Sequence, residues 1–466
     1  MPITPTNDLP AKAPGTAAVR ISGFGFHSAF GFRLSAFPLL GLFAMLLAGC
    51  QTTPMKTTAT RPPVKLGDEV LFQKHLELIR GKRVGLITNP TGLDSRLDSV
   101  IEKFRAQPDA HLVALYGPEH GVRGNAQAGQ FVPYYFDEHL QLPVFSLYGQ
   151  THKPPVDMMT NIDAYMRSFD TQGAGKQVET GMLNSVDVMV FDLQDVGTRV
   201  YTYVATMAYA MQAAADAGIP FIVLDRPNPI GGTVMEGPVL ESRQSSFIGL
   251  YPIPLRHGMT AGELARLFNA EFLDKKANLT VVPMENWSRG EWFDETGLPW
   301  VLPSPNLPTL DSTTVYPGQV ILEGTNLSEG RGTTKPFEMF GAPWIDGFVL
   351  AQKLNALNLP GVKFREVWFT PTFSKFSGEQ CGGCQLHVTD RNAYRSVAAT
   401  LAILAVIREL YGDKLELHAK YFDHVLGTSS VREALERGEP VAKIVAACTP
   451  GLERFETLRQ PYLLYR

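Results

Sequence analysis

Five short runs of apolar and β-branched residues recur between residues 83 and 226, and each is followed by a polar motif and then by a helix-like stretch. The runs read RVGLITN, HLVALYG, PVFSLYG, DVMVFDL and PFIVLDR. Short buried strands that alternate with amphipathic helices are typical of right-handed βαβ units. The pattern therefore predicts an α/β fold built on a mainly parallel sheet.

Two of the expected helices have clear ends in the sequence. The first runs from Tyr203 to Ala217, is rich in Ala and Met, and meets Gly218 and Pro220, which are residues that end helices. The second begins after Thr260, because a threonine followed three residues later by Glu263 forms a capping box. Both helices are expected to belong to the domain that holds the sheet.

The pattern changes in the second half of the chain. Residues 291–340 are rich in Gly, Pro, Ser and Thr, and from Trp344 onward helices alternate with strand-like pieces such as VKFREVWFTPTF and CQLHVTD. This alternation predicts a smaller α+β domain. We therefore expect a sheet domain at residues 65–300 and an auxiliary domain at residues 301–466.

The N-terminal part of the chain has the features of an export signal. Residues 34–50 read LSAFPLLGLFAMLLAGC behind Arg20 and Arg33, and the apolar core is too short for a permanent membrane span. The ending Leu-Ala-Gly-Cys resembles the lipobox of bacterial lipoproteins, so that Cys50 is the expected lipidation site. We expect a signal peptide at residues 1–49, a flexible tether at residues 50–64, and a lipoprotein anchored in the membrane and facing the periplasm. A plain secretion signal or a misassigned start is the alternative.

Composition and charge argue against one class of function, the binding of nucleic acid. The 466 residues carry a formal net charge of −4, and removal of the leader makes the chain more acidic. Runs of Lys and Arg are absent from the sequence, which argues against nucleic acid as a partner.

Four cysteines are present, at positions 50, 381, 384 and 448. One Cys-x-x-Cys motif cannot supply the four ligands of a structural zinc site. In an exported protein, Cys381 and Cys384 are expected to form a local disulfide across a tight Gly-Gly turn. A redox pair is the alternative.

The polar motifs after the predicted strands are the best candidates for chemistry. The carboxyl ends of parallel strands lie at one edge of a sheet, where ligands bind. The motifs supply Asn89, Glu119 with His120, Asp192 with Asp195, and Asp225. Two carboxyl groups in different environments are what glycoside hydrolysis requires. The structural alternative is that Asp192 and Asp225 cap helices.

Other classes of site are poorly supported by the motifs. No G-x-G-x-x-G follows a predicted strand, and the chain contains no phosphate-loop, G-x-S-x-G or H-E-x-x-H motif. We therefore predict neither a cofactor nor a metal. A metal held by His120, Asp192 and Asp195 is the remaining alternative, and it would make the protein an envelope amidase or esterase.

Arginines and aromatic residues near these motifs could bind a sugar that carries an anionic group. The arginines are Arg123, Arg199, Arg226 and Arg331, the last of them in a polar loop with Glu323 and Glu329. The aromatic residues, on whose faces sugars stack, are Tyr116, Tyr134, Tyr135, Tyr148, Tyr201, Tyr203 and Trp344.

Long strings of the sequence resemble one known family. They are YGPEHGVRGNAQAG, FDLQDVGTRVYTY, LDRPNPIGG with EGPVLE, LRHGMTAGELA and PSPNLPTLDSTTVYPGQVILEGTNLSEGRGTTKPFEMFGAPW. They are similar to the NamZ-type exo-β-N-acetylmuramidases, and the resemblance runs from about residue 65 to the C-terminal YLLYR.

The resemblance implies a Rossmann-like catalytic domain, a C-terminal auxiliary domain and a cleft between them. It also implies release of N-acetylmuramic acid (MurNAc) from the non-reducing ends of peptidoglycan fragments such as MurNAc-GlcNAc and muropeptides. Glu119 is then the candidate acid, with Asp192 or Asp195 as the second carboxylate and His120 beside them. The other candidate cleft residues are Asn89, Arg123, Arg199, Asp225, Arg226, Asn228, Glu236, His257, Asn306, Glu329 and Arg331. A lipoprotein that binds muropeptides without cleaving them is a further alternative.

Overall fold

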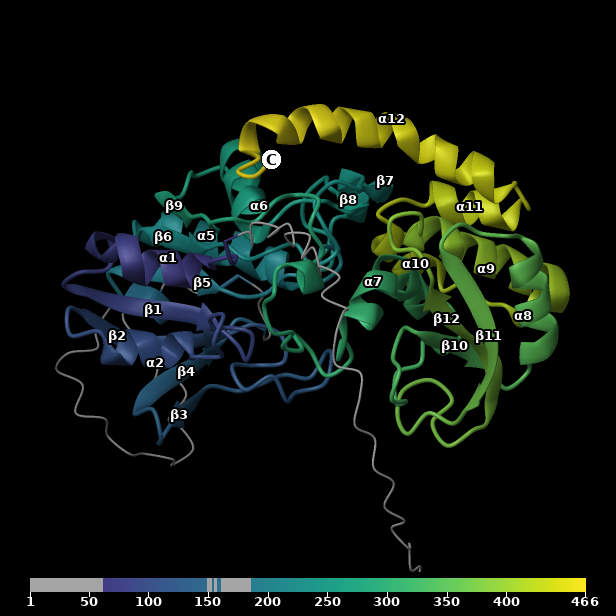
Figure 1. The fold of residues 1–466 in the computed structure, drawn as a ribbon, viewed down its shortest axis with the longest axis horizontal. Helices are drawn as coiled ribbons and strands as arrows, with labels where there is room; N and C mark the ends of the chain where they lie inside the picture. The colour runs from purple at the N-terminus through teal and green to yellow at the C-terminus, as the bar shows by residue number, and fades with distance from the viewer. Residues whose placement is uncertain (1–61, 149–152, 155–156, 161–185) are drawn as a thin grey trace, which may run out of the picture. The chain divides into compact units, whose positions relative to one another are not determined.

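Seven strands form the main sheet, and six of them run parallel (Figure 1). The computed structural model describes residues 62–148, 153–154, 157–160 and 186–466. The strands follow the order β3-β4-β2-β1-β5-β6-β9, and only β3 pairs antiparallel, with β4. Their bounds are Lys82–Thr88 for β1, Ala110–Gly117 for β2, Tyr135–Asp137 for β3, Leu142–Ser146 for β4, Val188–Asp192 for β5, Phe221–Leu224 for β6 and Leu279–Val282 for β9.

This strand order confirms the predicted Rossmann-like sheet. The chain moves outward from β1 through β2 to β4, returns to the other side of β1 at β5, and continues through β6 to β9. The strand order therefore reverses between β1 and β5. In sheets of this kind that switch point is the usual place for a ligand.

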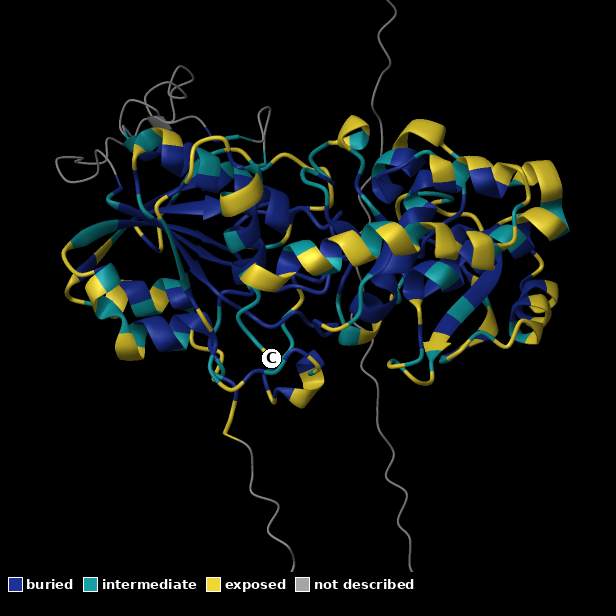
Figure 2. Cartoon of the chain, turned by 90° about the horizontal axis from the view of Figure 1, so that it is seen from above, coloured by how far each residue is buried: buried dark blue, intermediate teal, exposed yellow. Residues whose placement is uncertain are grey.

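Helices cover both faces of the sheet because alternate residues of each strand point to opposite sides. In β5, Val188 and Val190 join the apolar cluster that includes residues of α1 (Gly67–Lys74) and α2 (Val100–Ala106). Met189 and Phe191 join the cluster that includes residues of α5 (Tyr203–Ala217) and α6 (Ala261–Leu267). Strand β5, in the middle of the sheet, is accordingly buried along its whole length (Figure 2).

Both predicted helices are confirmed at their ends. Helix α5 spans Tyr203–Ala217 and ends at Gly218, which adopts the left-handed conformation with φ 72°. Helix α6 begins after Thr260, whose hydroxyl accepts from the Glu263 amide while the Glu263 carboxylate accepts from the Thr260 amide. Local sequence was sufficient here because each cap is formed by neighbouring residues.

The second half of the chain is α+β, as predicted. Strands β10 (Met339–Ala342), β12 (Cys381–Val388) and β11 (Val362–Phe369) form an antiparallel sheet in that order. The helices here are α7 (Leu310–Gln319), α8 (Gly347–Ala356), α9 (Ser396–Tyr411), α10 (Ala419–Leu426), α11 (Ser430–Glu436) and α12 (Val441–Arg459). The α5 cluster continues into this half through residues such as Phe340 and Ile403. Residues 61–466 thus form one compact unit, and the boundary near residue 300 stays a prediction.

The remaining elements are short. Strand β7 (Glu236–Val239) pairs with β8 (Pro254–Arg256), and α3 covers Asp157–Thr160. A π-helical turn at Phe268–Phe272 follows α6. Short 3-10 segments lie at Leu76–Leu78, Ser242–Gln244, Phe293–Glu295, Val320–Gly324, Gly412–Lys414 and Gln460–Tyr462.

Among the described residues, no helix has the length and apolar character that a membrane span requires. The predicted signal peptide and Cys50 lie outside the described residues.

The predicted disulfide is wrong. Cys381 and Cys384 lie in strand β12, and both are free and buried. Residues three apart in a strand point to opposite faces, so their sulfur atoms cannot meet. The glycines between them allow close packing, since a Cβ on Gly383 would lie 1.9 Å from the Phe340 carbonyl oxygen. Burial raises the pKa of Cys381 to about 11 and that of Cys384 to about 12, which also argues against a redox pair.

We expect alkylation to distinguish these thiols from a disulfide. When the purified protein is unfolded and alkylated without a reducing agent, the peptide that contains Cys381 and Cys384 should gain two alkyl groups. Native protein should react much more slowly at the same positions, because the thiols are buried and protonated. Peptide mass spectrometry measures both results. A peptide that is alkylated only after reduction would contradict the structure.

Candidate active site

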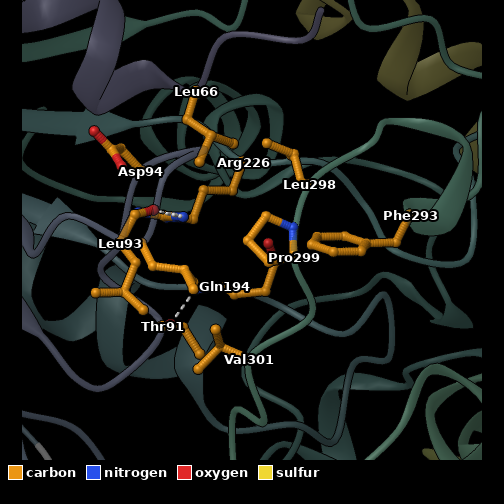
Figure 3. A pocket seen from close by; sticks show the side chains of 11 residues that line it. Leu66, Thr91, Leu93, Asp94, Gln194, Arg226, Phe293, Leu298, Pro299 and Val301 are labelled. Atoms are coloured by element: carbon orange, nitrogen blue, oxygen red, sulfur yellow. Dashed lines mark hydrogen bonds between the residues drawn. The ribbon is translucent and has the colours of Figure 1, made fainter.

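The switch point between β1 and β5 is closed by the protein's own chain (Figure 3). Thr91, Gln194 and Arg226 follow strands β1, β5 and β6 there, and residues 298–301 pack over them. The cavity that remains has a volume of about 20 Å³, which is room for a single water molecule. A substrate therefore cannot use the place where Rossmann folds usually bind ligands.

Asp192 and Arg226 form a buried ion pair beside this small cavity. Arg226 Nε donates to Asp192 Oδ1 at 2.6 Å and Nη2 donates to Oδ2 at 2.9 Å. Arg226 Nη1 donates to the Leu93 carbonyl oxygen at 3.0 Å. Burial lowers the pKa of Arg226, but the Asp192 carboxylate outweighs that effect and the pKa lies above its usual value. The pair joins the ends of β5 and β6, and Asp192 does not line the cavity that contains Glu119.

Asp225 caps helix α6 instead of facing a substrate. Its carboxylate is fully buried and accepts from the Gly262 amide at 2.7 Å, the Thr260 hydroxyl at 2.7 Å and the Tyr465 hydroxyl at 2.6 Å. The structure therefore supports the alternative that Asp225 caps a helix. Burial raises the pKa of Asp225 to about 6.

This raised pKa predicts how stability depends on pH. The folded chain binds the Asp225 proton more tightly than the unfolded chain, so stability is greatest below the unfolded pKa and falls as the pH rises from 4 through 6. The total loss should be about 3 kcal/mol. Asp225→Asn should remove this fall, because an amide does not titrate and the two hydroxyls can reorient. Urea unfolding of both proteins at pH 4, 5, 6 and 7 measures the difference, and parallel curves would contradict the assignment.

Asp195 and His257 contact each other below the strand ends. His257 Nε2 lies 3.2 Å from Asp195 Oδ2, which also accepts from the Gly197 amide at 2.7 Å. The other ring nitrogen of His257 accepts from the Met259 amide at 3.2 Å. Both side chains are buried, and neither lines the larger cavity described below.

Three further predicted residues hold backbone segments together. Asn89 accepts from the Thr91 amide at 2.9 Å, and Asn228 donates to the Met259 carbonyl oxygen at 3.0 Å. Arg199 is buried and donates to three carbonyl oxygens, those of Pro238, Ile253 and Val425. Burial lowers the pKa of Arg199 to about 9, so the guanidinium stays charged at neutral pH. It links the two halves of the chain.

Glu236 and Arg123 are also paired within the protein. Glu236 accepts from Arg256 at 2.7 Å and from the Val397 amide at 3.2 Å, at the start of helix α9. Arg123 forms an ion pair with Asp137 and stays outside the lining of the larger cavity.

The larger cavity has a volume of about 590 Å³, which is within the range of small-molecule sites. It is lined by the turn after β2, the residues before α5, helix α7 with the 3-10 segment that follows, and loops on either side of β10 and β11. The structure brings five predicted site residues together here: Glu119, His120, Asn306, Glu329 and Arg331.

Glu119 accepts hydrogen bonds only from neutral donors among the described residues. The Gly129 amide donates to Oε1 at 2.9 Å, and the Thr202 hydroxyl donates to Oε2 at 2.8 Å. The Tyr148 hydroxyl also contacts this carboxylate, and burial together with Glu119 raises the pKa of Tyr148 to about 12. No lysine or arginine in the described part of the chain forms an ion pair with Glu119, which therefore can exchange a proton without breaking such a pair.

His120 is held in one orientation by a strained turn. Its backbone is in the left-handed region with φ 73°, which is uncommon for a residue other than glycine. Its Nδ1 donates to the Ala126 carbonyl oxygen at 2.8 Å, because a carbonyl can only accept. Burial lowers the pKa of His120, although Glu119 acts in the opposite direction. The ring is therefore neutral near pH 7 and its Nε2 is an acceptor.

The second half of the chain contributes a charged network to the lining of the cavity. Arg331 contacts Glu323 at 2.6 Å and Glu329 at 3.3 Å, and Lys375 contacts Glu329 at 3.1 Å. The Tyr421 hydroxyl donates to Glu323 at 2.9 Å. Burial lowers the pKa of Arg331, but the two carboxylates outweigh it and hold the pKa above its usual value. Glu323 and Glu329 are thus paired with cations, whereas Glu119 is not.

The metal site that was kept as the alternative does not form among the described residues. His120 Nδ1 is bonded to Ala126, Asp192 is paired with Arg226, and Asp195 contacts His257. Within residues 62–148, 153–154, 157–160 and 186–466, no three His, Cys, Asp or Glu side chains are grouped as metal ligands. The arrangement of residues therefore gives no support to the amidase alternative.

Several cavity residues had no motif that could identify them. Glu323 lay in the polar loop recognised from the sequence, and Tyr201 and Tyr148 were among the aromatic candidates. Thr202 had no motif of its own. Five more lining residues come from the second half of the chain, far from the strand ends: Tyr316, Phe337, Phe373, Lys375 and Tyr421.

Two family models match the chain, and together they span nearly all of the described part. The model described as exo-beta-N-acetylmuramidase NamZ, N-terminal, matches residues 84–177 and 166–311, and its C-terminal counterpart matches residues 314–465. The peptidoglycan beta-N-acetylmuramidase NamZ of Bacillus subtilis is 48% identical over 428 residues, which cover 91% of this chain and 97% of that protein.

Two crystal structures of DUF1343 family proteins from Bacteroides fragilis have the same fold. One has a TM-score of 0.76 at 38% identity and covers 87% of this chain and 100% of its own. The other has a TM-score of 0.68 at 29% identity and covers 87% of this chain and 99% of its own. With matches of this extent in sequence and in structure, the chain belongs to the NamZ family of exo-β-N-acetylmuramidases.

Proposed function

We propose that this protein is an exo-acting glycoside hydrolase that releases MurNAc from the non-reducing ends of peptidoglycan fragments. The observation that carries the proposal is the position of Glu119 in the larger cavity, with neutral donors on its carboxylate and with Glu323, a carboxylate paired with Arg331, in the same lining. Glycosidases need two carboxyl groups in different environments, one to give a proton and one to stay ionised.

Glu119 acts as the general acid in this proposal. It protonates the glycosidic oxygen, so that the bond to the leaving GlcNAc breaks without forming an alkoxide. Water adds to the anomeric carbon to give free MurNAc, and the proton that this water loses restores the acid. Glu119 is suited to this step because the Gly129 amide and the hydroxyl groups around it orient the carboxyl group. Among the described residues Glu119 has no cationic partner, so its protonation disrupts no ion pair in that part of the chain.

Glu323 replaces Asp192 and Asp195 as the second carboxylate. Both aspartates are engaged elsewhere, whereas Glu323 lines the cavity and is paired with Arg331. A fixed negative charge in the cavity stabilises the positive charge that develops on the sugar ring. His120, neutral and oriented by Ala126, is placed to accept a hydrogen bond from substrate or water.

The reaction itself is tested with the disaccharide MurNAc-GlcNAc. Wild-type protein should release free MurNAc and free GlcNAc, detected by chromatography with mass spectrometry. A trisaccharide that begins with GlcNAc at its non-reducing end is the control, and it should remain intact because the enzyme acts from a terminal MurNAc. Recovery of the intact disaccharide together with tight binding would instead support a muropeptide-binding protein.

We further propose that the protein is exported and anchored through a lipid on Cys50, with the enzyme facing the periplasm. The support is the apolar run of residues 34–50 that ends in Leu-Ala-Gly-Cys. Wild-type protein expressed in a bacterium should fractionate with membranes, and Cys50→Ser should not acquire the lipid. Equal labelling of both proteins by a fatty-acid analogue would contradict the anchor.

A further inference from the structure

The larger cavity has a closed end and an open mouth. Tyr316, Phe337 and Leu307 line it and are almost fully buried. Phe373 and Tyr421 line it as well but are 40% and 41% exposed. An enzyme that removes a terminal sugar must hold that sugar at the closed end, so the rest of the glycan leaves through the mouth.

Glu119 is hydrogen-bonded both to an exposed and to a buried part of the cavity lining. Its Oε1 accepts from the amide of Gly129, which is exposed, while its Oε2 accepts from Thr202, which is buried next to Tyr201. The bond to be cleaved must lie within reach of Glu119. The sugar on the leaving side of that bond therefore meets the residues of the mouth, Phe373 among them.

The loop that carries Phe373 is fixed on both sides of this residue. Before it, the Thr372 amide and hydroxyl both donate to the Gly332 carbonyl oxygen, at 2.9 Å and 3.0 Å. After it, Lys375 Nζ donates to the carbonyl oxygens of Leu322 and Leu327, each at 2.9 Å, and contacts Glu329. These bonds tie the loop to the segment that carries the charged network. Phe373 is therefore held at the mouth before any substrate binds.

The backbone around Phe373 is strained in a way that supports a functional role. Ser374 and Phe376 have φ values of 72° and 58°, in the left-handed region that residues other than glycine rarely adopt. Gly332 is required beneath the loop, because a Cβ there would lie 2.5 Å from the Phe373 carbonyl oxygen. Strain of this kind persists when the surroundings enforce it, and it is concentrated at ligand sites. Phe373 lines the cavity on this loop and is 40% exposed.

We infer that Phe373 is a stacking platform for the leaving-side sugar, an N-acetylhexosamine ring in the β-linked glycan. The inference rests on the proposed function. The C–H groups of a pyranose ring carry partial positive charge, and the face of an aromatic ring is negative. The platform binds the leaving sugar and takes no part in proton transfer. Tyr421 is less suited to be the stacking platform, because its hydroxyl donates a hydrogen bond to Glu323.

The test compares two substrates that differ only on the leaving side. MurNAc-GlcNAc presents a sugar ring to the mouth, whereas methyl β-MurNAc presents a methyl group. Phe373→Ala should raise KM for the disaccharide about tenfold with little change in kcat, and should leave kcat/KM for the methyl glycoside unchanged. Phe373→Tyr should behave as wild type because it keeps the aromatic face. Trp368→Ala is the control, since Trp368 is 55% exposed on β11 and does not line the cavity.

Each other result overturns the inference in a different way. If Phe373→Ala lowers kcat/KM equally for both substrates, Phe373 acts at the MurNAc end of the cavity or is needed for the folding of the loop. Unchanged kinetics on both would show that the ring is not used. Failure of the wild-type protein to cleave either substrate would overturn the proposed function and, with it, this platform.

Discussion

Glu119→Gln should lower kcat for MurNAc-GlcNAc by about a thousandfold, which is the usual contribution of a general acid. The amide cannot donate a proton in the same way, but its oxygen still accepts from Gly129 or Thr202, so folding should be preserved. Release of MurNAc measured over time gives the rate. Glu102→Gln is the matched control, because Glu102 lies on helix α2 outside the cavity and its replacement should not change the rate.

A second substrate separates acid catalysis from a structural role. An aryl β-MurNAc with a 4-nitrophenyl leaving group needs little protonation to depart, so Glu119→Gln should lose far less activity on it than on the disaccharide. If the variant loses the same factor on both substrates while its thermal unfolding is unchanged, Glu119 is not the general acid.

Arg226→Met should destabilise the protein by about 3–5 kcal/mol, because it leaves the Asp192 carboxylate buried without a partner. Both charges lie where water is excluded, and the two hydrogen bonds between them offset the cost of burial. Urea unfolding followed by tryptophan fluorescence measures the loss.

The double variant Asp192→Leu with Arg226→Met distinguishes this cause from a general packing defect. Since it removes both charges, it should recover most of the lost stability. It should also keep activity if the pair only joins strand ends. A double variant as unstable as Arg226→Met would contradict the ion-pair explanation, and a stable but inactive one would return Asp192 to the candidates for catalysis.

The fold was predictable because its determinants are local or periodic. The five strand runs, the end of α5 at Gly218 and the Thr260 capping box can be recognised from neighbouring residues. The disulfide prediction failed because the Gly-Gly pair was interpreted as a turn. In the structure it permits close contact between β12 and the Phe340 backbone, a partner 43 residues away that no local pattern reveals.

The site was only partly predictable for a related reason. All the strand-end motifs were expected to share one cleft, but residues 298–301 close the switch point and isolate Asp192 and Arg226. Glu119 and His120 instead line a cavity together with Arg331, Glu323 and Lys375. Buried polar groups in proteins are almost always hydrogen-bonded. Most of the predicted site residues are buried and form hydrogen bonds or ion pairs with other parts of the protein.

The sequence by itself determined the α/β class, five strands of the main sheet, the ends of two helices and the family, because these depend on periodicity, caps and long specific strings. Only the tertiary structure decided which polar residues face a cavity and which are paired inside the protein. That choice depends on segments far apart in the chain, such as Thr202 against Glu119 and Lys375 against Glu329. Whether a carboxylate is available for chemistry depends on the partners that folding brings to it.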